Sequence, residues 1–495
     1  MEQIRRPFGA LSAALLLTAA PVAFAQEADA PAHTLSVEAP VELHAYYDQG
    51  GKRLWSGDRE ARRRLDELVS VLESDTYSGI ARTRYGLDRI RAAKDSANAD
   101  ALEAAASLAF TSLALDLRSG RIDPLINITE DAVAEREASR TEILKMLAEK
   151  GSVEDVLRNL RTDNPVQKEL LAILDRYKRY AEEEAWSPIT ISSDVLEEGA
   201  TGDDVAAVID RLAAEGFYSK PRFGGSSTPT YDSGVAEAVK RFQKSRGIVP
   251  DGVVGPNTLE RMNETPQQLV EKIRLNLERA RWLPQDFADR YLMVNIADFT
   301  VGAWEDEKQK FSIRTVVGTD YNKTPVFADE MEYVVANPYW NIPASILVNE
   351  IAPQQAKDPG YLASKNMEVV EGWGDDAPVI DPSQIDWNTV TGNETWRVRQ
   401  RGGPNNALGL IKFMFPNDYA VYLHDTPAES LFDETRRTFS HGCIRVEEPR
   451  KLAEWVLEGT EWEGRDRVDQ LIDSGERRTV SLAEPIPVYV TYFTV

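Results

Sequence analysis

Cys443 is the only cysteine in the chain, and it lies in the run Ser440-His441-Gly442-Cys443-Ile444-Arg445. A lone cysteine cannot form a disulfide within its own chain. Two of the four histidines lie nearby, His441 two residues before the cysteine and His424 nineteen residues before it. A thiol beside a basic imidazole becomes a nucleophile that attacks carbonyl carbons. We therefore interpret Cys443 as a catalytic nucleophile rather than as a small buried apolar residue.

The residues near Cys443 could supply the base and the oxyanion donors that an acyl transfer needs. Tyr422 and His424 are two residues apart on an expected strand, so both side chains face the same side. We expect a thiolate–imidazolium pair between Cys443 and His424, with His424 protonating the departing amine. Gly442 can adopt backbone conformations closed to other residues. The amides of Gly442 and Cys443 are therefore the expected donors to the developing oxyanion.

Two further roles stay open in the sequence. Asp425 could orient the second ring nitrogen of His424 through its backbone or through its side chain. Arg445, two residues after the thiol, could make the thiol more acidic, hold a substrate carboxylate, or form a surface salt bridge.

No cofactor or metal is predicted. The histidines lack Cys or carboxylate partners at zinc-binding spacing, and no glycine-rich phosphate loop precedes a helix. The net charge of −24 disfavours binding to nucleic acid or to anionic lipid.

The first 40 residues are interpreted as export and leader segments. Residues 1–25 have a basic start, an apolar stretch and an Ala-Phe-Ala cleavage site, which together predict a cleaved signal peptide. Residues 26–40 are rich in Ala and Pro and are expected to be disordered. No later stretch has 18 consecutive apolar residues, so no transmembrane span is predicted.

Three helical parts are predicted next. Residues 41–186 show apolar positions at three- and four-residue spacing and are expected to form a mostly helical scaffold domain. Residues 187–264 predict three short helices separated by glycine-rich turns, and this pattern resembles a peptidoglycan-binding module. The alternative is a three-helix packing domain that binds no ligand. Residues 265–290 are expected to form a linker helix.

Residues 291–495 contain short β-rich runs and few helices, which indicates a β-rich catalytic domain. Within it, residues 338–395 form an excursion too long for an ordinary loop and rich in aromatic residues, so an ordered capping lid is favoured. The predicted fold class is therefore an α+β multidomain protein: a β-rich catalytic domain, a helical scaffold and a small three-helix module.

The cysteine run with His424 upstream resembles the L,D-transpeptidases of bacterial cell walls. Further matching pieces are Tyr422-Leu423-His424-Asp425-Thr426-Pro427, Gly403-Pro404 with Asn406-Ala407-Leu408-Gly409, and Trp340-Asn341-Ile342-Pro343. The scaffold, the wall-binding module and the lid resemble the large multidomain branch of that family. The resemblance implies Cys443, His424, Gly442 and His441 as catalytic residues, and Tyr422, Arg445, Ser440, Trp340 and Asn406 as substrate-binding residues.

The resemblance also implies an activity. Cys443 would attack the carbonyl of the third residue of a peptidoglycan tetrapeptide stem and expel the terminal D-alanine. A second stem would take the acyl group, giving a 3→3 cross-link in the periplasm, and carbapenems would acylate the thiol.

Three alternatives stay open. The same site could serve an L,D-carboxypeptidase, with water as the acceptor, or could attach peptidoglycan to an outer-membrane protein. A non-catalytic wall-binding scaffold is the third. A papain-like protease is disfavoured, because its cysteine would precede its histidine.

Overall fold

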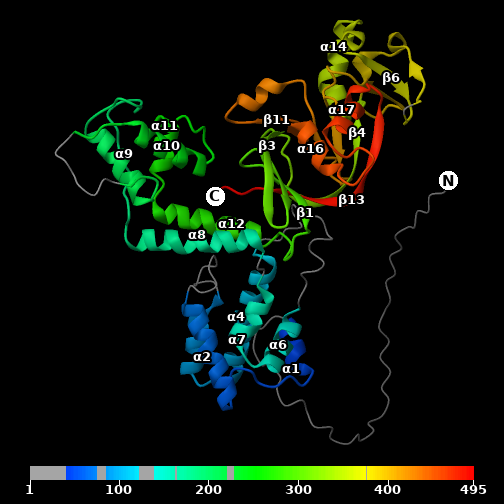
Figure 1. Ribbon diagram of the computed structural model, residues 1–495. Helices are drawn as coiled ribbons and strands as arrows, with labels where there is room; N and C mark the ends of the chain where they lie inside the picture. Colours follow the sequence, from blue (N-terminus) through cyan, green and yellow to red (C-terminus); the bar gives the residue numbers. More distant parts are fainter. Residues whose placement is uncertain (1–40, 75–84, 122–138, 162–163, 220–227, 375) are drawn as a thin grey trace, which may run out of the picture.

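The computed structural model describes residues 41–74, 85–121, 139–161, 164–219, 228–374 and 376–495 (Figure 1). The predicted signal peptide and leader lie outside these residues. Four parts are visible: an N-terminal helical domain, a pair of long helices, a small helical module at one end of that pair, and a β-rich domain at the other. No helix in the described ranges combines the length and apolar content that a membrane span needs.

The N-terminal domain is helical, as predicted. Its helices are α1 (Val41–Asp48), α2 (Arg59–Glu73), α3 (Leu87–Asp95), α4 (Ala99–Ser119), α6 (Arg140–Lys150) and α7 (Val153–Leu160). Asp58 and Asn98 cap the first turns of α2 and α4, and Ser139 with Glu142 forms a capping box on α6. The apolar faces of these helices share one core with α4 at its centre.

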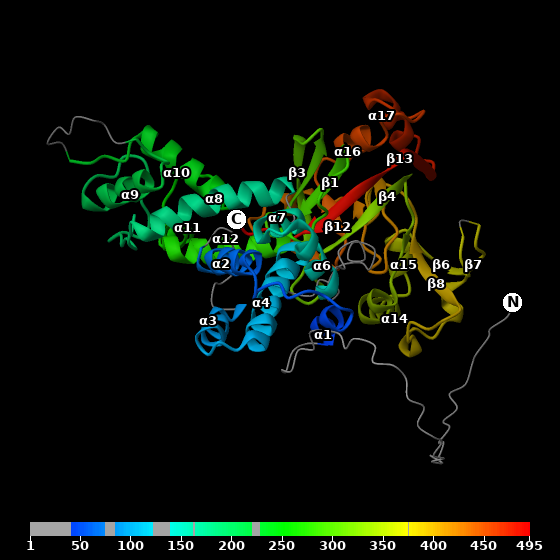
Figure 2. The ribbon, with the colours of Figure 1, turned by 90° about the horizontal axis from the view of Figure 1, so that it is seen from below.

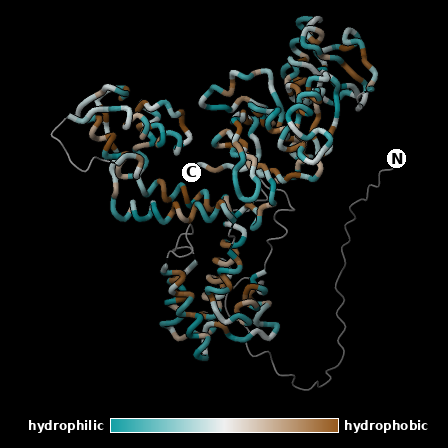
Figure 3. Tube along the Cα trace, in the orientation of Figure 1, coloured by the Kyte–Doolittle hydropathy of each residue, from teal (hydrophilic) through white to brown (hydrophobic). Residues whose placement is uncertain are grey.

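Helices α8 (Pro165–Glu182) and α12 (Pro266–Ala280) form an antiparallel pair. Asn164 at the start of α8 donates to the Ala280 carbonyl at 2.9 Å, and Gln267 at the start of α12 donates to the Ala181 carbonyl at 3.1 Å. Hydrophobic positions recur along both helices and pack between them (Figure 3). The predicted boundary at residue 186 therefore cuts through a structural unit, because α8 packs on the linker helix.

The small module contains the three predicted helices, α9 (Asp203–Ala214), α10 (Ser233–Ser245) and α11 (Pro256–Met262). A buried carboxylate, Glu215, joins this module to α8. It accepts hydrogen bonds from Arg211 at 2.9 Å, from Arg246, and from the Tyr177 hydroxyl on α8. Arg211 also stacks over Trp186, with 4.0 Å between the guanidinium carbon and the ring centroid. The module is thus fixed to the helix pair through one charge cluster.

Replacing Glu215 with glutamine is expected to destabilise this module by about 3–5 kcal/mol, because two buried guanidinium groups lose their counter-charge. Hydrogen exchange of the α9 and α10 amides, followed by mass spectrometry, measures the change. The matched control is Glu237→Gln, which removes the exposed Lys240–Glu237 pair of the same module and should leave exchange unchanged. Equal exchange in the two variants would contradict the prediction.

The β-rich domain is built on a nine-stranded sheet in the order β11-β3-β12-β10-β9-β4-β13-β1-β2. The sheet curls so that β2 also pairs with β3. Its strands are β1 (Arg290–Asn295), β2 (Thr300–Glu305), β3 (Lys308–Gly318), β4 (Phe327–Ala336), β9 (Ile411–Met414), β10 (Leu423–His424), β11 (Thr438–Ser440), β12 (Ile444–Val446) and β13 (Arg478–Thr491). Helices α16 (Pro449–Val456) and α17 (Arg465–Asp473) contribute to its apolar core.

The C-terminal end of this sheet is tied to the helix pair. Asn276 of α12 donates to the Thr494 hydroxyl at 3.0 Å and accepts from the Thr494 amide at 2.8 Å. The orientation of the catalytic domain relative to α12 is therefore set by hydrogen bonds as well as by the short connection from α12 to β1 (Figure 1).

The predicted lid is an ordered subdomain with its own sheet and core, which we call the cap. Its sheet has the order β5-β8-β6-β7, with β5 (Trp340–Asn341), β6 (Met367–Glu371), β7 (Val379–Ile380) and β8 (Trp396–Gln400). Its helical segments are α13 (Ala344–Ile346), the π-helical η3 (Leu347–Ile351), α14 (Ala352–Lys357) and α15 (Tyr361–Ser364), followed by the 3₁₀ turns η4 (Pro382–Gln384) and η5 (Trp387–Thr389). The predicted end at residue 395 differs from the structure, because β8 pairs with β5 and β6 of the cap.

The cap and the three-helix module lie at opposite ends of the catalytic domain in both ribbon views (Figure 2). The three-helix module is therefore not positioned to contact the cap or to hold it in place.

Candidate active site

The turn that carries Cys443 is fixed by hydrogen bonds on both sides. The Ser440 hydroxyl donates to the Cys443 carbonyl at 2.5 Å and accepts from the Gly442 amide at 3.0 Å. The Thr324 hydroxyl donates to the Gly442 carbonyl at 2.7 Å and accepts from the Gly318 amide at 2.9 Å. Gly442 has φ +116°, in the region that favours glycine.

This arrangement corrects the predicted oxyanion site. The Gly442 amide donates to Ser440, so it does not point freely at a substrate oxygen. The Cys443 amide stays the candidate donor, and Ser440 acts on the turn rather than on the substrate.

Strand pairing gathers five polar side chains on one face of the sheet. In β10, His424 lies opposite Lys412 of β9 on one side and opposite Arg445 of β12 on the other. Tyr422 lies beside Cys443, because the Ile444 amide donates to the Tyr422 carbonyl at 3.0 Å. The alternate residues Phe413, Leu423 and Ile444 are fully buried in the core on the other face. We call Lys412, Tyr422, His424, Cys443 and Arg445 the active-site face.

His424 is held as a neutral base. Its Nδ1 lies 2.5 Å from the Asp425 carbonyl oxygen, which can only accept, so Nδ1 carries the hydrogen and Nε2 has the lone pair. The backbone of Asp425 therefore orients the ring, since its carboxylate accepts from the Leu410 and Thr426 amides, both at 2.7 Å. Burial lowers the pKa of His424 to about 3, and the Arg445 charge adds to this effect.

Cys443 is a partly buried thiol whose Sγ contacts the Ala420 carbonyl at 3.8 Å. Burial raises its pKa, while hydrogen bonds from Tyr422 and the charges of Lys412 and Arg445 act in the opposite direction. Burial disfavours the charged form of each partner, so the pKa shifts favour a neutral pair at rest over the predicted thiolate–imidazolium pair. His424 must then remove the thiol proton as the sulfur attacks.

Three predicted site residues lie away from the thiol. The exposed His441 ring is 3.1 Å, Nε2 to Oε1, from Glu350 of η3, so it links the catalytic turn to the cap. Trp340 lies on β5 and packs against the core of the cap. The buried Asn406 amide donates to the carbonyl of Pro338 at 3.1 Å and to that of Arg401 at 2.9 Å. These two residues lie on the two chain segments that connect the cap to the large sheet.

Lys412 and Thr324 were missed as site residues. Lys412 projects from β9 beside His424, with Nζ 3.7 Å from the Tyr422 ring centroid. Burial lowers its pKa to about 8. Alternation along the expected strand at 412–415 could have placed Lys412 on the polar face. Gly318 with Thr324-Pro325 matches the core of the family in sequence, but this motif did not indicate that Thr324 contacts a glycine 118 residues later.

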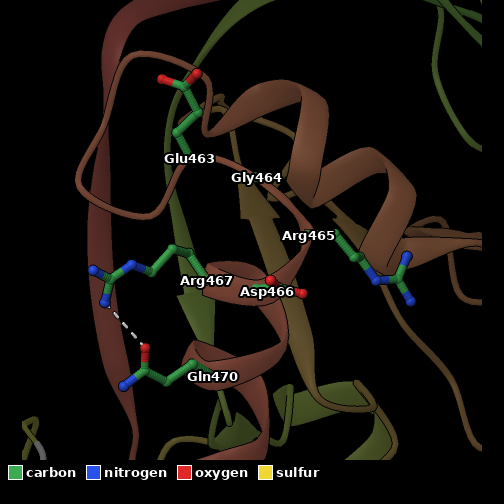
Figure 4. Close-up of a pocket in the computed structure, with 6 residues that line it drawn as sticks. All are labelled: Glu463, Gly464, Arg465, Asp466, Arg467 and Gln470. Atoms are coloured by element: carbon green, nitrogen blue, oxygen red, sulfur yellow. Dashed lines mark hydrogen bonds between the residues drawn. The ribbon is translucent and has the colours of Figure 1, made fainter.

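Two hollows of the catalytic domain lie outside the active-site face. One, of about 460 Å³, is lined by Glu463, Gly464, Arg465, Asp466, Arg467 and Gln470 around the start of α17, and Arg467 donates there to Gln470 at 3.1 Å (Figure 4). The other, of about 640 Å³, lies beside β11 and is lined by Thr319, Asp320, Tyr321, Glu434, Thr435, Arg436, Thr438 and Phe439. Within the described residues, no three His, Cys, Asp or Glu side chains gather as a metal site.

Replacing Thr324 with valine is expected to slow acylation of Cys443 by about 10- to 100-fold, because the turn loses both hydrogen bonds of the hydroxyl. The rate of adduct formation on the intact protein, followed by mass spectrometry, measures this. The control is Thr319→Val, in the same loop, whose hydroxyl accepts only from the exposed Asn322 amide. Equal rates for both variants would show that the turn does not depend on Thr324.

Comparison with known families gives three matches along the chain. Residues 289–469 match a family model described as an L,D-transpeptidase catalytic domain. Residues 201–262 match a "Putative peptidoglycan binding domain", and residues 42–174 match a scaffold domain.

Individual proteins give a consistent result. A Haemophilus influenzae protein named "Putative L,D-transpeptidase" is 33% identical over 226 residues, covering 46% of this chain and 45% of that protein. The N-acetylmuramoyl-L-alanine amidase CwlL of Bacillus licheniformis is 42% identical over 64 residues, covering 13% of this chain and 17% of that protein. The matched parts thus span less than half the length of these relatives.

Among solved structures, an L,D-transpeptidase from Stackebrandtia nassauensis aligns over 61% of this chain and 97% of its own, with 14% identity and a TM-score of 0.23.

Proposed function

We propose that the protein joins two peptidoglycan stem peptides through a thioester on Cys443, since residues 289–469 match a family model of the L,D-transpeptidase catalytic domain. The observation that carries the proposal is the position of Cys443 and His424 on adjoining strands, with a free basic nitrogen on His424. A diagonal pair on neighbouring strands is within reach of a side chain as long as histidine.

The first half-reaction forms the thioester. His424 Nε2 accepts the thiol proton while Sγ attacks the carbonyl carbon of the third stem residue. The carbonyl oxygen becomes an oxyanion and accepts from the Cys443 amide. The carbon–nitrogen bond to the terminal D-alanine then breaks, and His424 returns the proton to the departing amine.

The second half-reaction transfers the acyl group. The side-chain amine of a second stem attacks the thioester carbon, and His424 takes one proton from that amine. The carbon–sulfur bond breaks, the thiol recovers its proton, and a 3→3 cross-link remains. The cap, held against the catalytic turn by the His441–Glu350 contact, would limit the access of water to the thioester.

The three-helix module is consistent with an enzyme that acts on the cell wall. The three-helix module would bind peptidoglycan and hold the catalytic domain near its polymeric substrate. We place the activity in the periplasm, in line with the substrate of the family. The thiol would also be the residue that carbapenems acylate.

Product analysis tests this proposal. The protein is mixed with purified disaccharide-tetrapeptide and the products are weighed by mass spectrometry. A dimer lighter than two monomers by one alanine molecule is expected. Disaccharide-tripeptide with free alanine, and no dimer, would instead identify a carboxypeptidase. Unchanged substrate would contradict both activities and leave a wall-binding scaffold.

A further inference from the structure

Two cations flank the catalytic histidine on the active-site face. Lys412 and Arg445 are the register partners of His424 on the two neighbouring strands, β9 and β12. Neighbouring strands are about 4.8 Å apart, so the three side chains leave the sheet side by side. Both cations lie close enough to Cys443 to influence its charge. The thiol thus faces a small, strongly positive surface.

Neither cation pairs with an anion in the part of the chain that the structure describes. Among the residues that the structure describes, no carboxylate lies within ion-pair distance of Lys412 or Arg445, and the buried Nε of Arg445 has no hydrogen-bond partner. Other arginines of this domain behave differently: Arg399 is 2.7 Å from Glu368, and Arg450 is 2.5 Å from Asp469. Partly buried cations without a counter-charge are unfavourable. Two such cations side by side, in a chain of net charge −24, point to an anion supplied by the substrate.

Burial supports the same interpretation. It lowers the pKa of Lys412 to about 8 and also lowers the pKa of Arg445. These shifts are expected for cations that are partly removed from water and have no neighbouring anion. The Lys412 ammonium meanwhile lies on the face of the Tyr422 ring, a position that stabilises a cation without neutralising it.

We propose that Lys412 and Arg445 bind the free terminal carboxylate of the donor peptide, the carboxylate of the residue that is expelled. This inference rests on the proposed function. In a peptide cut at its last bond, that carboxylate lies within about 4 Å of the attacked carbonyl, because consecutive Cα atoms are about 3.8 Å apart. The terminal carboxylate can therefore contact Lys412 and Arg445 while the attacked carbonyl carbon contacts Sγ of Cys443. The pair therefore selects peptides whose scissile bond is the last one.

The test compares two donors that differ only at this carboxylate. Disaccharide-tetrapeptide with a free terminal acid and the same molecule with a terminal carboxamide are each mixed with the full-length protein. The rate of thioester formation is followed by intact-protein mass. We expect the acid to react about 10- to 100-fold faster than the amide. Equal rates would overturn the inference while leaving the proposed function standing. A thioester with neither donor would overturn the proposed function, and this site with it.

Substitution of Lys412 separates carboxylate binding from an effect on the thiol. In Lys412→Met the ratio of the acid-donor rate to the amide-donor rate should fall by about 10-fold, whatever change both donors share through the thiol. An equal loss for both donors would mean that Lys412 acts on the thiolate or on the fold, and would overturn the inference. The control is Lys451→Met, an exposed lysine paired with Glu448, which should change neither rate.

A third donor identifies which carboxylate is bound. The diamino acid at stem position three can carry a carboxylate of its own, so a donor with lysine there, which has none, is compared at equal concentration. We expect the acid-over-amide preference to persist with this donor. Loss of the preference would assign the site to the third residue and overturn our assignment to the terminal one.

Discussion

Replacing Cys443 with alanine is expected to abolish thioester and cross-linked product, lowering turnover by about 10⁴-fold or more. Among the groups of the active-site face, a thiol is intrinsically the strongest nucleophile toward an acyl carbon. The fold should be kept, because hydrogen bonds of Ser440 and Thr324 to backbone groups hold the turn without the thiol.

Product formation and the thermal unfolding midpoint are measured on the same preparation. Cys443→Ser is the matched control for side-chain volume, because it replaces the thiol with a hydroxyl of similar size. This variant should also be inactive on the timescale of the experiment. A cross-link made by Cys443→Ala at more than about one hundredth of the original rate would show that another group is the nucleophile.

Replacing His424 with glutamine should lower the rate of thioester formation by about 10²- to 10⁴-fold. The resting thiol is neutral, because burial raises its pKa, so the reaction needs a base at the moment of attack. Glutamine approximates the size of the ring and can still donate to the Asp425 carbonyl, but it offers no basic nitrogen.

The pH profile of the unsubstituted protein gives an independent check. Because burial lowers the pKa of His424 to about 3, the ring stays neutral and competent as a base from pH 8 down to about pH 5. The rate of thioester formation should therefore show no fall near pH 6.5, where an unperturbed histidine would become protonated. A tenfold loss between pH 7 and pH 5.5 would contradict the neutral, buried His424.

The identity of the nucleophile and its base could be predicted from the sequence because both depend on local rules. A period of two along a strand places Tyr422 and His424 on one face, and glycine before the cysteine indicates a turn of unusual backbone geometry. Helices α9 and α10 of the small module were likewise predictable from their apolar spacing.

The features that the sequence could not give depend on distant contacts. The pKa values of Cys443 and His424 are shifted by burial and by Lys412, which lies on a neighbouring strand. Neither burial nor this strand pairing has a local signal in the sequence.

Two of the predicted domain limits, at residues 186 and 395, differ from the packing for the same reason. An apolar stripe on α8 shows that the helix packs, but not that its partner is α12, one hundred residues away. Similarly, the alternation in β8 identifies a strand without telling which of two sheets it joins. His441 is close to the thiol in sequence, yet its exposed side chain contacts Glu350 of the cap.

The central claim is that Cys443 carries the donor peptide as a thioester. The most direct measurement mixes the protein with disaccharide-tetrapeptide, quenches in acid, and determines the intact mass and the modified residue by peptide fragmentation. The account predicts an added mass equal to the donor minus one alanine molecule, located on Cys443 and released by hydroxylamine. An unmodified Cys443 while product accumulates, or an adduct on another residue, would contradict the account.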